Sequence, residues 1–103
     1  MVTQWEQIAL REGVRFSPVT LPKVRFVEAL EPLRAFALLI FKQQDIWIQP
    51  SNTTLVRLSY RPPHFGIEVW REGAAHLQMT WTPDFNKVTD LLSKYQAYIG
   101  VEE

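Results

Sequence analysis

Hydrophobic and polar residues alternate with a period of two between Ile46 and Thr82, in four short runs rich in β-branched and aromatic side chains. Alternation of this kind is typical of half-buried β-strands. Turn-forming residues separate the runs, and such short connections imply antiparallel pairing. We therefore predict an antiparallel meander of about four strands over residues 46–82. The predicted strands are Ile46 to Gln49, Leu55 to Arg61, Phe65 to Arg71 and Leu77 to Thr82.

The two phases of this alternation differ in chemistry. One phase is apolar enough to line a core: Ile46, Ile48, Val56, Leu58, Tyr60, Ile67, Val69, Leu77, Met79 and Trp81. The second phase mixes polar and aromatic residues: Trp47, Gln49, Arg57, Ser59, Arg61, Glu68, Trp70, Gln78 and Thr80. A sheet with one covered face normally places polar residues on its other face. The tryptophans of the second phase therefore need either a covering element or a partner.

The C-terminal segment has the pattern of an amphipathic helix over residues 84–99. Thr82 or Asp84 would cap this helix, Pro83 suits its first turn, and Gly100 would end it. Packed on the apolar phase of the meander, the helix would complete a two-layer α+β fold, with helices on one face of an antiparallel sheet and 1–103 forming a single domain. The apolar stripe that supports the helix is Phe85, Val88, Leu91, Leu92, Tyr95, Tyr98 and Ile99.

Residues 23–43 allow two interpretations. Apolar residues recur at helical spacing, but a proline inside a helix costs about 3 kcal/mol. We therefore favour a helix that holds Pro32 in its first turn, preceded by a separate segment from Lys23 to Leu30 that is strand or helix. Alternatively, Phe36 to Phe41 form a strand that pairs with Asp45 to Gln49.

The N-terminal part of the sequence has weaker signals. Thr3 and Glu6 have the spacing of a capping box, which predicts a short helix that ends near Gly13. Val14 to Pro22 contains two prolines and predicts an irregular, extended crossing.

The composition indicates one soluble domain and excludes few partners. The chain has 103 residues, of which 47% are hydrophobic, and its 11 Lys and Arg balance its 11 Asp and Glu. This balance provides no overall field to attract polyanions, and it favours self-association. The absence of cysteine and of a secretory-type leader favours a cytoplasmic location. The longest apolar run, Ala35 to Phe41, is far below the roughly 20 residues of a membrane span, so we expect no membrane partner.

No residue pattern identifies a catalytic, cofactor or metal site. His64 and His76 are the only histidines in the sequence, and neither has a second ligand at metal-binding spacing. The four glycines are isolated, so they form no phosphate-binding loop. We therefore assign no catalytic residue, no cofactor and no metal ligand, and a small enzyme of unknown reaction is a minor alternative.

The second phase of the meander holds the candidate site. Tryptophan and arginine are enriched at interface hot spots. We predict a small non-enzymatic protein-interaction or assembly module, able to self-associate as a homo-oligomer through this sheet face. The candidate partner-binding residues are Trp47, Arg57, Arg61, Glu68, Trp70 and Gln78.

Two other interpretations of the same residues stay open. In the first, the face binds single-stranded nucleic acid such as RNA, with bases stacked on Trp47 and Trp70 while Arg57, Arg61 and Arg71 meet phosphates. In the second, the chain's own N-terminal segment covers this face, and the tryptophans belong to the core.

Overall fold

A computed structural model describes residues 19–28 and 31–102 of the chain. This part has an α+β fold with one antiparallel sheet of six strands and two helices. The elements in chain order are β1 (Val24–Glu28), α2 (Pro32–Phe41), β2 (Ile46–Ser51), β3 (Thr54–Arg61), β4 (His64–Arg71), β5 (Gln78–Thr82), α3 (Phe85–Lys94) and β6 (Ala97–Glu102).

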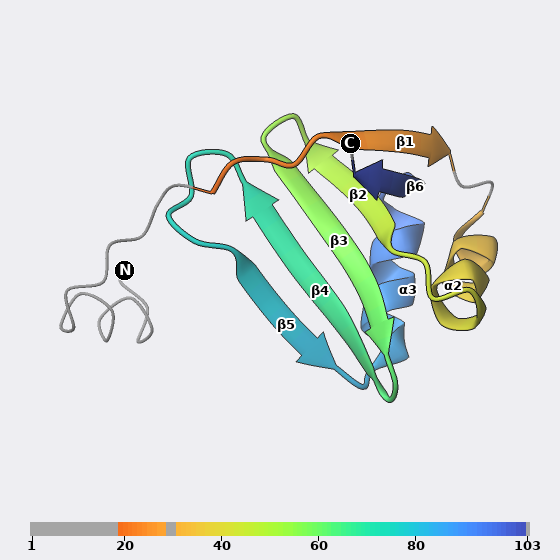
Figure 1. The fold of residues 1–103 in the computed structure, drawn as a ribbon. Helices are drawn as coiled ribbons and strands as arrows, with labels where there is room; N and C mark the ends of the chain where they lie inside the picture. The colour runs from red at the N-terminus through yellow and green to blue at the C-terminus, as the bar shows by residue number, and fades with distance from the viewer. Residues whose placement is uncertain (1–18, 29–30, 103) are drawn as a thin grey trace, which may run out of the picture.

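The sheet has the strand order β1-β6-β2-β3-β4-β5 (Figure 1). Strands β2 to β5 pair in chain order as an antiparallel meander; two-residue turns join β2 to β3 and β3 to β4, and residues 72–77 connect β4 to β5. After α3 the chain returns as β6, which inserts between β2 and β1. Among the described residues, β1 and β5 therefore form the two edges of the sheet, and β5 lies at the left edge in Figure 1.

The predicted fold class and meander are confirmed, but the number of strands was too low. The additional strands are β1 and β6. The predicted C-terminal helix was also too long, since α3 ends at Lys94 and residues Ala97–Glu102 form β6. Tyr98 and Ile99 continue the apolar stripe of the helix, but they also alternate as a strand does. Pairing with β1 and β2 on both sides decides between these two conformations.

Strand β1 (Val24–Glu28) precedes helix α2 (Pro32–Phe41): the favoured interpretation predicted this helix and left the segment before it open as strand or helix. Pro32 occupies the first helical turn of α2, where its missing N–H leaves no helical hydrogen bond unmade. The alternative strand from Phe36 to Phe41 is wrong, because these residues complete α2. For α3, the Asp84 side chain caps the helix by accepting a hydrogen bond of 3.0 Å from the Asn86 N–H.

Both helices pack on the same face of the sheet and enclose the hydrophobic core. Each helix contributes two fully buried side chains. The strands contribute residues from the phase predicted to be apolar, so this assignment is confirmed for β2, β3 and β4. The buried core residues are Ala35, Leu39, Ile46, Ile48, Val56, Leu58, Phe65, Val88, Leu92 and Ala97, and Tyr60, Ile67 and Val69 pack against them partly buried.

The predicted phase of β5 is wrong. Thr80 pairs with Ile67 and therefore lies on the helix side, whereas Met79 pairs with Glu68 and lies on the opposite face together with Trp81. The connection between β4 and β5 sets this register, and a change of one residue in a connection transfers every side chain of a strand to the other face. Met79 and Trp81 are 42% and 41% exposed instead of contributing to the core.

The predicted N-terminal helix lies outside the described residues, as does the first part of the predicted crossing from Val14 to Pro22. Residues 19–23 have no regular structure, and the Val19 N–H donates a hydrogen bond of 2.6 Å to the Ala74 carbonyl beyond β4. In the described ranges, neither helix has the length and apolar character needed to cross a bilayer.

Candidate binding surface beside strand β5

A row of four side chains crosses the sheet on the face opposite the helices. Trp47 on β2 pairs with Arg57 on β3, Arg57 pairs with Glu68 on β4, and Glu68 pairs with Met79 on β5. Residues directly opposite each other in an antiparallel sheet share a face. The prediction that Trp47, Arg57 and Glu68 lie together on the second face is therefore confirmed.

Trp47 is buried, which agrees with the alternative that placed the tryptophans in the core and not with the predicted partner-binding role; the N-terminal cover of that alternative lies outside the described residues. Its side chain is 1% exposed, and the indole lies over Gly100 of β6 beside the Val24 side chain. Because glycine has no side chain, the strand surface at Gly100 leaves a recess that the indole fills. Trp47 thus belongs to a packed layer on this face and is not accessible to a partner.

Arg57 and Glu68 form an ion pair inside the same layer. An Arg57 Nη lies 2.5 Å from a Glu68 Oε, and Glu68 is buried. The guanidinium also lies 5.4 Å from the centroid of the Trp47 ring and 6.0 Å from that of Trp70. Removing one partner of such a pair is strongly destabilising because the other charge stays buried. The arrangement therefore first supports the fold, with the arginine held between two indoles.

Trp70 is half-buried at the margin of this layer. Its indole N–H is buried, and no described residue accepts a hydrogen bond from it. Of the remaining predicted residues, Arg61 and Gln78 are exposed. Gln78 pairs with Val69 and lies on the helix side, so its predicted place on the second face is wrong. The six candidate residues thus do not form one continuous open surface.

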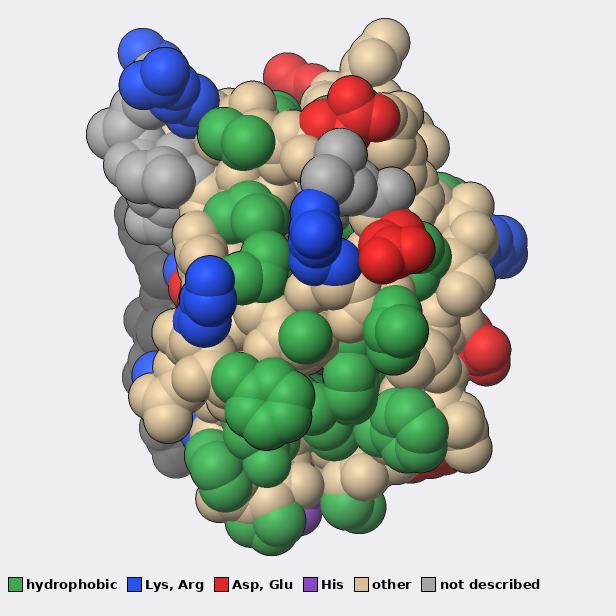
Figure 2. All heavy atoms as spheres, turned by 90° about the vertical axis from the view of Figure 1, so that its right-hand side faces the viewer, with side chains coloured by type: hydrophobic (Ala, Val, Ile, Leu, Met, Phe, Trp, Pro, Cys, Tyr) green, Lys and Arg blue, Asp and Glu red, His purple; other side chains and the backbone are tan. Residues whose placement is uncertain are grey.

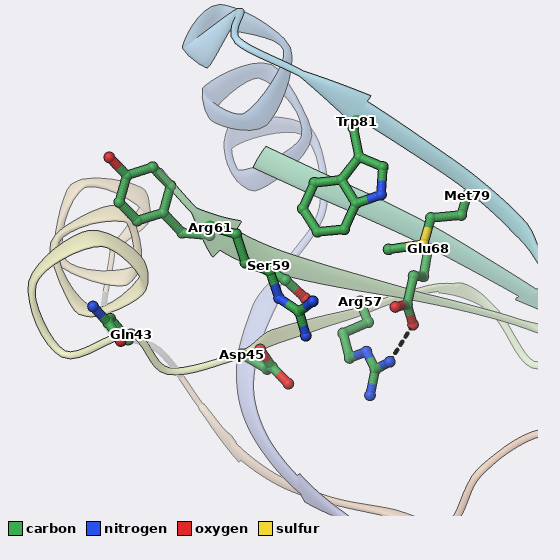
Figure 3. Close-up of a pocket in the computed structure, with 9 residues that line it drawn as sticks. Gln43, Asp45, Arg57, Ser59, Arg61, Glu68, Met79 and Trp81 are labelled. Carbon is green, nitrogen blue, oxygen red and sulfur yellow. Dashed lines mark ion pairs between the residues drawn. The ribbon is translucent and has the colours of Figure 1, made fainter. Parts of the chain in front are cut away.

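The accessible part of this face is a hollow of about 530 Å³ near the β5 edge. Figure 3 shows the indole of Trp81 on one wall and the side chains of Asp45 and Arg57 across from it. The Arg61 guanidinium lies 5.8 Å from the Trp81 ring centroid, and no described residue forms an ion pair with it. The hollow therefore offers an exposed indole and an arginine whose N–H donors form no ion pair with a described residue. Its lining residues are Gln43, Asp45, Arg57, Ser59, Tyr60, Arg61, Glu68, Met79 and Trp81.

The sequence reasoning missed Trp81 and Met79 as site residues, since it assigned both to the core. A glycine supports the exposed indole, as one does at Trp47. A Cβ on Gly66, which pairs with Trp81, would lie 2.8 Å from the Trp81 ring. This neighbour relation depends on the register of β5, which no local pattern in the sequence specifies.

Strand β5 also has a backbone edge with which no described strand pairs, and we call it the free edge. A two-residue turn joins Arg61 to His64, and the pair that closes such a turn exchanges both of its hydrogen bonds. Hydrogen-bonded and non-hydrogen-bonded residue pairs alternate along antiparallel strands. When this alternation is followed from Arg61 and His64 across β4, the backbone N–H and C=O of Thr80 point toward β4. Those of Met79 and Trp81 point away from the sheet. Strand β5 carries no Lys and no Pro, which are residues that commonly protect such edges.

A second hollow of about 520 Å³ adjoins β5 on the helix side. Ile67 and Val69 of β4 line it together with Leu77 and Thr80. The helices cover the middle of the sheet and leave this part open, as the exposure of Gln78 and Thr80 indicates. The free edge of β5 is therefore flanked by a hollow on each face of the sheet.

Comparisons with models of protein families, with curated proteins and with solved structures found no match to this chain. In the described ranges, no group of three or more His, Cys, Asp or Glu side chains is arranged to hold a metal ion. The geometry around β5 is therefore the basis for assigning a function.

Proposed function

We propose that this chain is a protein-interaction module that binds an extended segment of a partner protein along β5. The segment would add a strand to the sheet, with main-chain hydrogen bonds to the backbone of Met79 and Trp81. The free edge of β5, with a hollow on each side, is the observation that carries this proposal. Recognition by strand addition derives affinity from main-chain hydrogen bonds and specificity from pockets for alternate side chains.

The two hollows specify the chemistry of the partner segment. On the face of the ion-paired layer, Arg61 and Trp81 favour an acidic or aromatic side chain, because no described carboxylate forms an ion pair with the Arg61 guanidinium. On the helix side, Ile67 and Val69 favour a β-branched or aliphatic side chain. The partner segment should therefore alternate between these two classes.

Single-stranded nucleic acid is a less supported partner. Bases would need accessible aromatic faces, and Trp47 is 1% exposed. Trp81 packs over Gly66, while the guanidinium of Arg61 lies near its ring. A base could therefore stack on Trp81 only by displacing Arg61.

A library of random peptides displayed on phage tests the proposal with the full chain as bait. We expect enrichment of extended, alternating sequences that carry acidic or aromatic residues at every second position. The Met79→Pro variant should bind these peptides at least tenfold more weakly, because it removes an outward N–H at an edge position where proline is tolerated.

Met79→Ala is the matched control, since it removes the side chain and keeps the N–H. The strand-addition mechanism predicts that Met79→Ala binds more tightly than Met79→Pro, while circular dichroism shows both variants folded. Failure to enrich any peptide, or equal binding by these two variants, would reject the proposal.

A further inference from the structure

Helix α2 is apolar around its whole circumference but is buried on only one side. Its ten residues are Pro-Leu-Arg-Ala-Phe-Ala-Leu-Leu-Ile-Phe, and all of them except Arg34 are apolar. Ala35 and Leu39 face the core and are fully buried. Leu33 and Phe41, which are eight residues apart and share the outer side, are 75% and 83% exposed. A helix that is apolar all round is normally buried all round.

The half-buried flank of α2 at Phe36 contacts α3. The Phe36 and Phe85 rings lie 5.5 Å apart between centroids, and Phe85 is 50% exposed. Figure 2 views the molecule from the side that carries α2. Hydrophobic side chains gather in the lower half of this view, whereas acidic and basic side chains lie mainly above them and at the margins. We call Leu33, Phe36, Phe41 and Phe85 the helical patch.

We propose that the helical patch is the interface of a homodimer, occupied by the same patch of a second copy of this chain. The inference goes beyond strand addition at β5, because it uses a different surface and different residues. A two-fold dimer brings identical surfaces together, so the helical patch of each copy would be buried against that of the other.

The exposed area agrees with the requirement of a small dimer. A standard interface takes about 800 Å² from each partner, of which about 56–65% is apolar. With about 200 Å² for an aromatic side chain and somewhat less for leucine, the exposed fractions of Leu33, Phe41 and Phe85 amount to roughly 400 Å². The exposed part of Phe36, which is half-buried, brings the total close to the lower end of the apolar area of a standard interface.

The charges at the ends of α2 also fit a second copy. The helix begins after the exposed Glu31 and ends before the exposed Lys42. Antiparallel pairing of two α2 helices would place the acidic end of one beside the basic end of the other and would oppose their dipoles favourably. The whole chain has zero formal net charge, so two copies do not repel each other.

Sedimentation equilibrium and light scattering on the full chain, from micromolar to submillimolar concentration, test the dimer. The mass should rise with concentration toward twice 12.1 kDa. Phe41→Lys should raise the dimer Kd at least tenfold, because it places a charge in the apolar interface and keeps a favourable basic residue at the helix C-terminus. Leu33→Glu should have a similar effect and provides a second variant if Phe41→Lys fails to fold.

Val27→Lys is the matched control, because Val27 is 56% exposed on β1 and lies outside the helical patch. It should dimerise like the unmodified chain. A chain that stays monomeric at all these concentrations overturns the inference. So does a dimer that persists in both patch variants and dissociates in Met79→Pro, which would locate the contact at β5. Peptide binding at β5 should be unchanged in Phe41→Lys, so the two proposals fail separately.

Discussion

Substitution of Gly100 by alanine tests whether Trp47 is locked into the fold. A Cβ built on Gly100 would overlap the indole of Trp47 and would lie 2.6 Å from Val24 Cγ1, which is much closer than real Cβ contacts. Trp47 cannot move outward freely, because it is 1% exposed and its neighbours hold it. The added methyl group must therefore shift packed atoms on β1 and β2.

The expected destabilisation follows from two opposing effects. Overpacking of a closed site costs about 1–3 kcal/mol, and occasionally more. Replacing glycine by alanine also restricts the unfolded chain, which stabilises the folded state by about 0.4–1 kcal/mol where the backbone conformation is compatible. The overlap at Gly100 involves a buried ring and an adjacent strand, so the first effect should dominate. Because the overlap with a buried ring places the cost in the upper half of its range, we expect a net loss of about 1–2.5 kcal/mol, or roughly 4–8 °C in Tm for each kcal/mol.

Gly66→Ala is the matched control, since its Cβ would also meet a tryptophan ring, at 2.8 Å from Trp81. Trp81 is 41% exposed and can swing toward solvent, so this variant should lose less than about 1 kcal/mol. Denaturant unfolding followed by circular dichroism measures both free energies. If Gly100→Ala unfolds within about 0.5 kcal/mol of the unmodified chain, or if the two variants lose equal stability, the inferred burial of Trp47 is refuted.

Three further predictions concern the same layer and the cap of α3. Trp47→Ala should cost about 3–5 kcal/mol in denaturant unfolding and Trp81→Ala less than about 1 kcal/mol, and equal losses would contradict the assigned burial. Glu68→Ala should lower the free energy of unfolding by about 2–4 kcal/mol, a range that allows for the partial exposure of Arg57. The double variant Arg57→Met with Glu68→Leu should recover most of that loss in thermal unfolding, because it leaves no charge buried. No recovery would argue against a buried ion pair. Asp84→Ala should cost about 1 kcal/mol through loss of the helix cap, and unchanged stability would exclude this role.

The elements predicted correctly are those with strong local signals. Period-two alternation located β2 to β5, and the place of Pro32 in its apolar run located α2. Strand β6 was missed because Tyr98 and Ile99 satisfy both a helical stripe and a strand alternation. The choice depends on pairing with β1 and β2, which are distant in sequence. Propensity alone cannot settle a segment that fits both patterns.

The candidate site was predicted less well than the fold, for a related reason. The side-chain types were informative, and three of them do lie together as Trp47, Arg57 and Glu68. Their burial depends on what lies across the sheet, such as the recess at Gly100, and a sequence pattern contains no such information. The exposed indole proved to be Trp81, because the connection before β5 reverses the phase of that strand.

The two proposed surfaces share no residue, so each can be altered without changing the side chains of the other. Strand β5 forms the left edge of the sheet in Figure 1, whereas α2 packs on the helix-covered face and lies on the right. A dimer through the helical patch would not use the outward backbone groups of Met79 and Trp81. Such a dimer could hold two partner segments, one at each β5 edge. A partner with two matching segments would therefore bind more tightly than a single segment binds to one β5 edge. Loss of dimerisation would then weaken binding of a two-segment partner while leaving the Kd for a single peptide unchanged.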